Sequence, residues 1–262
     1  MSSQLKSLSE LTNSLAATFP LDHYPAGEQG GIYKPSNRLV ARLGLVLDPW
    51  SGLSQWLTEA EIDALCIHRP WGIDLTTLLP DIGVIYHHLP FDETMTIGYN
   101  PSLAGLMDAV SPLESIGYKQ ASGETGIMLP KRPVGMLFDI PEQEFDGVLN
   151  QISRMFIGYE RAEAGRCPTG YYGIRRVAVV GAMTDTLVRE AHERGVDLYI
   201  TGQYRKIAQK AVDESGMAVI AVGHRRSEEW GLHRLAMVIN EQFPQIHTFI
   251  PTHEQNAYVV GA

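Results

Sequence analysis

Residues 177–228 read VAVVGAMTDTLVREAHERGVDLYITGQYRKIAQKAVDESGMAVIAVGHRRSE. Within this stretch, three short apolar runs are each followed closely by a glycine and alternate with segments of helical period; the runs are 177–180, 197–200 and 218–222. This order predicts a βαβαβα unit with parallel strands, whose functional groups gather beyond the carboxyl ends of the strands. His224 and Glu228 come directly after the last of these glycines, Gly223.

The first half of the chain alternates in the same way. Residues 43–47, 64–67 and 83–86 read as buried strands, and residues 53–62 read as a helix. Composition turns to Gly, Ser and polar residues at 117–126, which suggests a domain junction. Further predicted elements are a strand at 134–139, a helix at 142–156 and a last helix that begins at Ser227. The sequence therefore predicts an α/β fold with parallel or mixed sheets.

Bulk composition excludes several classes of protein. At 262 residues, with 44% hydrophobic and 19% charged residues, the chain can bury a full core, in one large domain or two ordinary ones. No apolar run approaches the roughly 18–20 residues that a bilayer crossing needs, and residues 5–19 lack the apolar core of a secretory signal. The formal net charge of −9 works against nucleic-acid binding. We expect a cytoplasmic protein with Cys66 and Cys167 reduced.

Candidate metal ligands follow the predicted strands in three clusters. These are His68, then His88 with Asp92 four residues later, and His224 with Glu228 four residues later. Imidazole and carboxylate together suit zinc, manganese, iron or nickel, and a set without thiolates is more typical of reactive sites than of structural zinc. Each pair taken alone is more often a structural pair or an exposed face. Their shared position after strands is what favours a metal site.

Two of these clusters carry a resemblance to a known family. The string Asp197-Leu198-Tyr199-Ile200-Thr201-Gly202, followed by Gly223-His224-Arg225-Arg226-Ser227-Glu228, resembles the "DvYlTGe … GHy-x-SE" signature of the Nif-three-like family, also known as GTP cyclohydrolase I type-two homologues. His68-Arg69-Pro70 stands where the family has His-His-Pro, and His88-Leu89-Pro90-Phe91-Asp92 where it has His-Thr-Asn-x-Asp. The resemblance covers nearly the whole chain and is densest after Val177.

The resemblance implies two α/β domains with a metal site in the cleft between them. It implies a first domain from 1–120 and 220–262, and a second from 121–219. One or two divalent metals per chain would be held by His68, Asp92, His224 and Glu228, with His88 beside the metals as a catalytic proton carrier. Adjacent strand residues point to opposite faces, so one of His87 and His88 should face the site. Several members form toroidal hexamers, which implies a homo-oligomer.

The chain also departs from the family pattern. Arg69 replaces a histidine ligand, and a guanidinium has no lone pair for a metal. Gln203 replaces an acid, and Tyr204-Arg205-Lys206 stands where histidines are common, so a second metal should bind weakly or not at all. Arg69, Arg225 and Arg226 could instead receive a small anionic, nucleotide-like substrate, because guanidinium pairs bidentately with phosphate. The alternative is that Arg225 and Arg226 neutralise Glu228 and Glu229 or project into solvent.

Two functional hypotheses remain open from the sequence. The first is a metal-dependent hydrolase acting on a small anionic substrate. The second is a non-enzymatic metal- or ligand-binding oligomer, regulatory or a metal chaperone, whose site is partly degraded. The replacements at Arg69 and Gln203 favour the second hypothesis more than they would in a typical relative. Nucleic-acid binding is a third reading, disfavoured by the charge.

Overall fold

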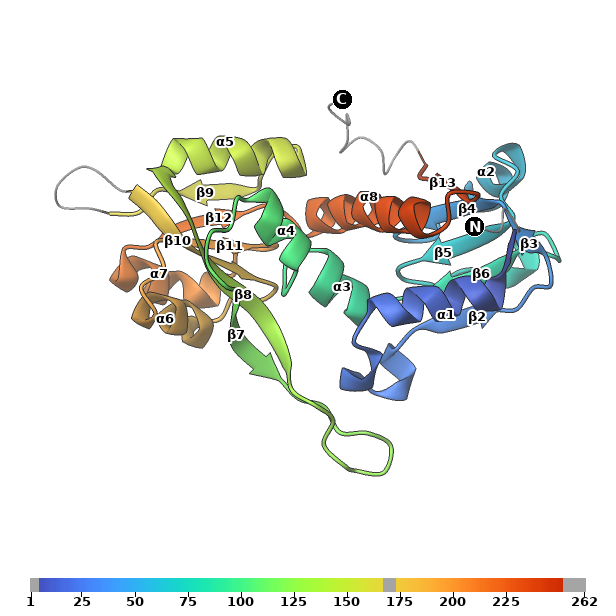
Figure 1. The fold of residues 1–262 in the computed structure, drawn as a ribbon, viewed down its shortest axis with the longest axis horizontal. Coiled ribbons are helices and arrows are strands. Elements are labelled where there is room, and N and C mark those ends of the chain that lie inside the picture. The colour runs from blue at the N-terminus through green and yellow to red at the C-terminus, as the bar shows by residue number, and fades with distance from the viewer. Residues whose placement is uncertain (1–4, 167–172, 252–262) are drawn as a thin grey trace. The chain divides into compact units, whose positions relative to one another are not determined.

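The computed structural model describes residues 5–166 and 173–251. Contacts between Cα atoms divide the chain into two compact units (Figure 1). The first unit comprises Met1–Phe91, Ala121–Pro130 and Gly231–Ala262, and the second comprises Asp92–Gln120 and Lys131–Trp230. Both are α/β structures, so the predicted fold class is confirmed. Among the described residues, no helix is both long and apolar enough to cross a membrane.

A five-stranded mixed sheet forms the centre of the first unit. Its order is β13-β4-β5-β6-β2, with β2 antiparallel to β6 and the other pairs parallel. The strands are β2 (Gly31–Lys34), β4 (Arg42–Val46), β5 (Ala64–Ile67), β6 (Gly83–Tyr86) and β13 (His247–Phe249). A two-stranded ribbon, β1 (Lys6–Ser7) with β3 (Leu39–Val40), completes the unit. The predicted strands at 43–47, 64–67 and 83–86 are therefore present.

Helices bury the faces of this sheet. Helix α1 (Leu8–Thr18) begins with a capping box between Ser7 and Glu10 and buries Leu8, Leu11 and Leu15. Helix α2 (Leu53–Glu59) packs Leu53 and Leu57 into a cluster with Val46, Leu65, Ile67 and Val84 from the strands. Cys66 faces the interior, and burial raises the pKa of its thiol to about 12, which keeps it protonated and unreactive. Cys167 lies outside the described residues.

The second unit contains a six-stranded mixed sheet in the order β7-β8-β10-β11-β12-β9. The strands are β7 (Glu114–Lys119), β8 (Arg132–Glu144), β9 (Arg161–Glu163), β10 (Gly173–Val180), β11 (Leu198–Thr201) and β12 (Ala218–Ala221). The neighbours β10, β11 and β12 run parallel in the register that pairs Val180 with Thr201 and Thr201 with Ala221. This confirms the parallel unit predicted from residues 177–228.

Helices cover both faces of the second sheet (Figure 1). Helix α6 (Asp185–Glu193) is capped by the Thr184 hydroxyl, which accepts a hydrogen bond from the Leu187 amide at 3.2 Å. It packs with α7 (Gln209–Ser215) on one face, and α5 (Phe145–Phe156) buries Val148, Ile152 and Phe156 on the other. Helix α4 (Pro101–Leu106) has the predicted Asn100 cap, with a hydrogen bond to the Leu103 amide at 3.2 Å.

Several details differ from the sequence-based expectation. Residues 117–126 are not a junction between separate segments, because they belong to the hairpin that joins β7 to β8. Since β7 pairs with β8, residues 92–120 contact the second unit, whereas the expected division placed them with the first. Helix α8 (His224–Gln242) begins one turn before Ser227, directly after Gly223, whose φ of +102° ends the preceding loop.

Candidate metal centre

His68 is fixed at the carboxyl end of β5. Its backbone amide continues the sheet with a hydrogen bond to Val46 O at 2.9 Å, and its side chain is 3% exposed. The ring atom Nδ1 lies 2.9 Å from the backbone carbonyl of His87. A carbonyl oxygen can only accept, so Nδ1 carries the proton and Nε2 carries the lone pair. A metal ion approaching from the Nε2 side would therefore meet the right tautomer.

The neighbouring histidines at the end of β6 point in different directions. His87 is buried against Phe19, with ring centroids 4.8 Å apart, and its Nδ1 lies 3.1 Å from Gln29 O. Burial lowers the pKa of His87 to about 4, so it is neutral at physiological pH. His88 turns the other way, toward His68, with a ring-centroid distance of 5.0 Å. The expected division of roles between the two histidines follows from the alternation of strand residues.

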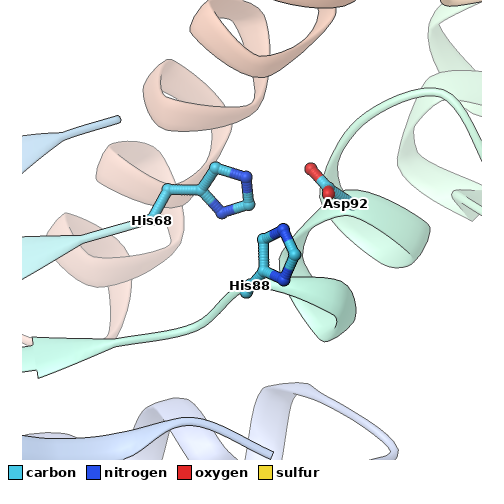
Figure 2. Close-up of side chains that lie close together, drawn as sticks. All are labelled: His68, His88 and Asp92. Atoms are coloured by element: carbon cyan, nitrogen blue, oxygen red, sulfur yellow. The ribbon is translucent and has the colours of Figure 1, made fainter. Parts of the chain in front are cut away.

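Asp92 completes a group of three side chains. Helix α3 (Leu89–Met95) starts immediately after His88, so His88 and Asp92 are separated by one helical turn. The boundary between the two units falls inside α3, and the continuous helix fixes Asp92 relative to His88. One ligand atom each from His68, His88 and Asp92 can be chosen so that all lie within 4.8 Å of one another. Figure 2 shows the two rings and the carboxylate turned toward one another.

Two residues near this group were not singled out from the sequence. The Glu28 carboxylate lies 3.6 Å from His88 Nδ1, and the exposed Trp71 ring stands perpendicular to His88 with centroids 4.7 Å apart. Glu28 comes from a loop region with no motif of its own, so nothing in the sequence marked it. Trp71 follows His68-Arg69-Pro70, and a large aromatic residue that close to a candidate ligand was the available signal.

His224 and Glu228 form a separate pair on the first turn of α8. His224 Nε2 lies 3.1 Å from Glu228 Oε1. The histidine side chain is 62% exposed, whereas the glutamate side chain is 1% exposed. Among the described residues, the one group of three or more potential ligands is His68, His88 and Asp92, and it does not include this pair. A role for His224 and Glu228 as metal ligands stays a prediction.

Two of the three arginines expected to bind an anionic substrate are held by carboxylates. Arg69 forms a two-pronged pair with Asp48, at 2.6 Å from Nε and 2.9 Å from the second nitrogen. Arg225 Nε donates to Glu229 Oε1 at 2.9 Å, as the alternative interpretation expected. Arg226 lies against the backbone at Gly158 and Gly223. Both ion pairs occupy donors that an anionic ligand would otherwise use.

Comparisons with known proteins agree with the fold and the site motifs. The sequence profile described as Duf34/NIF3 (NGG1p interacting factor 3) matches residues 7–256. A relative from Pyrococcus abyssi named GTP cyclohydrolase 1 type 2 homolog is 24% identical over 249 residues, covering 89% of this chain and 93% of its own length. A relative of the same name from Pseudomonas aeruginosa is 28% identical over 209 residues, covering 73% and 76%.

A solved structure supports the same fold. The crystal structure of TTHA1606 from Thermus thermophilus superposes with a TM-score of 0.67 at 20% sequence identity. The superposition covers 94% of this chain and 97% of that one. At this identity the similarity concerns the arrangement of helices and strands.

Proposed function

We propose, for a chain that belongs to the Duf34/NIF3 family, that it is a metal-dependent hydrolase acting on a small anionic, nucleotide-like substrate. The observation that carries the proposal is the group of His68, His88 and Asp92. Relatives bear the name GTP cyclohydrolase 1 type 2 homolog, so GTP is the first substrate to test.

The donor set fits a divalent metal ion. Two imidazoles and one carboxylate are the ligand types of catalytic zinc and of non-haem iron sites, which keep positions open for water or substrate. Bonds of about 2.0–2.2 Å to a tetrahedral zinc ion place its ligands roughly 3.4 Å apart. The ligand atoms here lie within 4.8 Å, so small side-chain movements would bring them to that spacing. The metal that best suits the site, and whether a second one binds, stay predictions.

The surrounding residues support the three proposed ligands. His87 O holds the His68 ring in one tautomer, and Glu28 lies where it attracts the proton on His88 Nδ1 and directs Nε2 to the metal. His88, interpreted from the sequence as a proton carrier, is thus proposed here as a ligand. When bound, a divalent cation would supply an acidified water and polarise a carbonyl or phosphoryl oxygen of the substrate.

The exposed indole of Trp71 gives a direct test of where metal binds. Nickel or cobalt ions quench indole fluorescence at short range, and the Trp71 ring is 4.7 Å from the His88 ring. Titration of chelator-treated protein with either ion should quench part of the tryptophan emission, and Trp71→Phe should remove that part. Trp56→Phe is the matched control, because Trp56 packs against Trp50 instead. Equal quenching in both variants would place the metal elsewhere and remove the basis of the proposal.

A non-enzymatic metal- or ligand-binding role is the second candidate. The observation that favours it is the pairing of Arg69 with Asp48 and of Arg225 with Glu229, which leaves these arginines less able to receive a substrate. Metal-loaded protein that binds GTP without converting it, while retaining one metal per chain, would support this role. Hydrolysis of GTP that is lost in Asp92→Asn would support the enzyme. Self-association, with a hexamer as the size suggested by the family, stays a prediction.

A further inference from the structure

A hollow of about 610 Å³ lies wholly within the second unit, beyond the carboxyl ends of its parallel strands. Gly181 follows β10 directly and Gly202 follows β11 directly, and both line the hollow. His224, at the start of α8 after β12, lines it as well. Ligands of open α/β sheets bind at this edge, and the volume is in the range of small-molecule sites.

Positive charge gathers on the wall of this hollow. Arg205 is exposed on the wall, and in the part of the chain that the structure describes it takes part in no ion pair. Lys119 also lines the hollow and lies 3.1 Å from Glu93 Oε1, but the same carboxylate accepts from Arg132 Nε at 2.7 Å. One carboxylate thus serves two cations. Together with Arg205, these groups leave the local charge positive.

The start of α6 contributes in the same direction. Thr184, its capping residue, lines the hollow, and the positive end of the helix dipole favours an anion there. Asp185, in the first turn, would oppose an anion, but its carboxylate is held by Arg189 at 2.8 Å and 3.3 Å. The helix end therefore adds to the cationic side chains.

An apolar wall faces part of the same space. Met183 and Ile207 line it, and the Ile207 side chain is 78% exposed. An exposed isoleucine beside cationic groups suits a ligand with both an anionic and an apolar or planar part. Arg205 differs in this respect from Arg69 and Arg225, because those two are already held by carboxylates.

We infer that this hollow binds a phosphorylated small molecule of nucleotide size, with Arg205 as the main contact of the phosphate. A guanidinium makes charge-assisted, two-pronged hydrogen bonds to phosphate, and the apolar wall contacts the remainder of the molecule. Binding at this place needs no metal ion, so it stands or fails separately from the proposed hydrolase. Inorganic phosphate alone would leave the apolar wall without a role, so the ligand carries an apolar or planar part as well.

The test uses the full-length protein after removal of metal with a chelator, titrated calorimetrically with guanosine 5′-monophosphate and with guanosine. The nucleotide should bind more tightly than the nucleoside to the unmodified protein. Arg205→Ala should weaken nucleotide binding by roughly tenfold or more, since a hydrogen bond to a charged group contributes about 1.5–3 kcal/mol. Guanosine affinity should be unchanged. Lys206→Ala is the matched control, because Lys206 is an exposed neighbour that does not line the hollow.

Amide chemical shifts locate the binding. Saturating nucleotide should shift the amides of Gly181, Thr184 and Gly202 in the metal-free protein. The inference is overturned if Arg205→Ala binds the nucleotide as well as the unmodified protein, if Lys206→Ala loses as much affinity, or if the shifts gather around His68 instead. Absence of nucleotide binding to metal-free protein at millimolar concentration would also overturn it, while leaving the metal group and its hydrolase role untouched.

Discussion

The His68 ring donates a hydrogen bond from Nδ1 to the backbone carbonyl of His87, over 2.9 Å. This bond joins the ends of two neighbouring parallel strands, β5 and β6, through a side chain and a main-chain group. The carbonyl belongs to the sheet framework, so the ring orientation of His68 is as well fixed as the strand end itself. His88, the next residue, presents its own ring to the same space.

Replacement of the proposed ligands should abolish tight metal binding. Loss of a group that merely orients a ligand costs about 10–100-fold in affinity, so loss of a ligand should cost roughly 100-fold or more. We expect this in His68→Ala and in Asp92→Asn, measured by calorimetric titration with zinc and by elemental analysis. Asp92→Asn conserves side-chain shape, so it separates a loss of ligation from a loss of folding. His192→Ala, at an exposed histidine of α6, should bind metal normally.

Much of this arrangement could be predicted from the sequence, because it depends on local patterns. Apolar runs that end in glycine predicted the parallel strands, and Thr184 and Asn100 marked helix starts through side-chain chemistry. The alternation of strand residues predicted that one of His87 and His88 would face the site. These features are set by neighbours along the chain.

The remaining features depend on contacts between distant segments. Asp48 and Arg69 are 21 residues apart, and no local pattern shows that their side chains meet after neighbouring strands. Glu28 reaches His88 from a separate loop for the same reason. The Leu106 and Val110 side chains, expected on the inner face of a helix, are 44% and 67% exposed, because α4 ends at Leu106. Periodicity alone could not fix that end.

Glu28 should strengthen metal binding through His88. Its carboxylate attracts the proton on Nδ1, which makes the other ring nitrogen a better ligand. Because the Glu28 side chain is 41% exposed, we expect Glu28→Gln to weaken zinc binding by up to about tenfold, less than loss of a ligand. Asp22→Asn, which removes an acid from the same region, is the control. Equal zinc affinity in Glu28→Gln and the unmodified protein would show that Glu28 has no such role.

Gly30 should be essential for the shape of the site. Its φ is +82°, and a Cβ atom at this position would lie 2.5 Å from His87 Nδ1 and even closer to the Tyr86 carbonyl. Gly30→Ala should therefore lower the free energy of unfolding by roughly 2–3 kcal/mol and displace His87 from its contact with His68. Gly27→Ala meets nothing within 4 Å and should change stability by less than about 0.5 kcal/mol. Urea unfolding and zinc titration of both variants measure the two effects.

Acid should weaken the second unit through Glu114. This carboxylate accepts from Arg176 at 2.5 Å and from Arg194 at 2.8 Å, and these hydrogen bonds, that of Arg176 first, lower its pKa below the ordinary 4.5. A lowered pKa in the folded state means that the unfolded chain takes up the proton first, so the stabilisation is present above pH 4.5 and is lost as the pH falls through the folded value.

Glu114→Gln should therefore remove part of the acid sensitivity. The side chain is 46% exposed, so solvent screens the pairs and we expect an effect of at most about 1 kcal/mol in the free energy of unfolding. Urea unfolding at neutral pH and at about pH 3 should show a smaller pH dependence in Glu114→Gln than in the unmodified protein. Glu124→Gln, at an exposed acid that makes no ion pair among the described residues, should keep the full pH dependence. A steeper acid loss in Glu114→Gln would contradict the sign of this linkage.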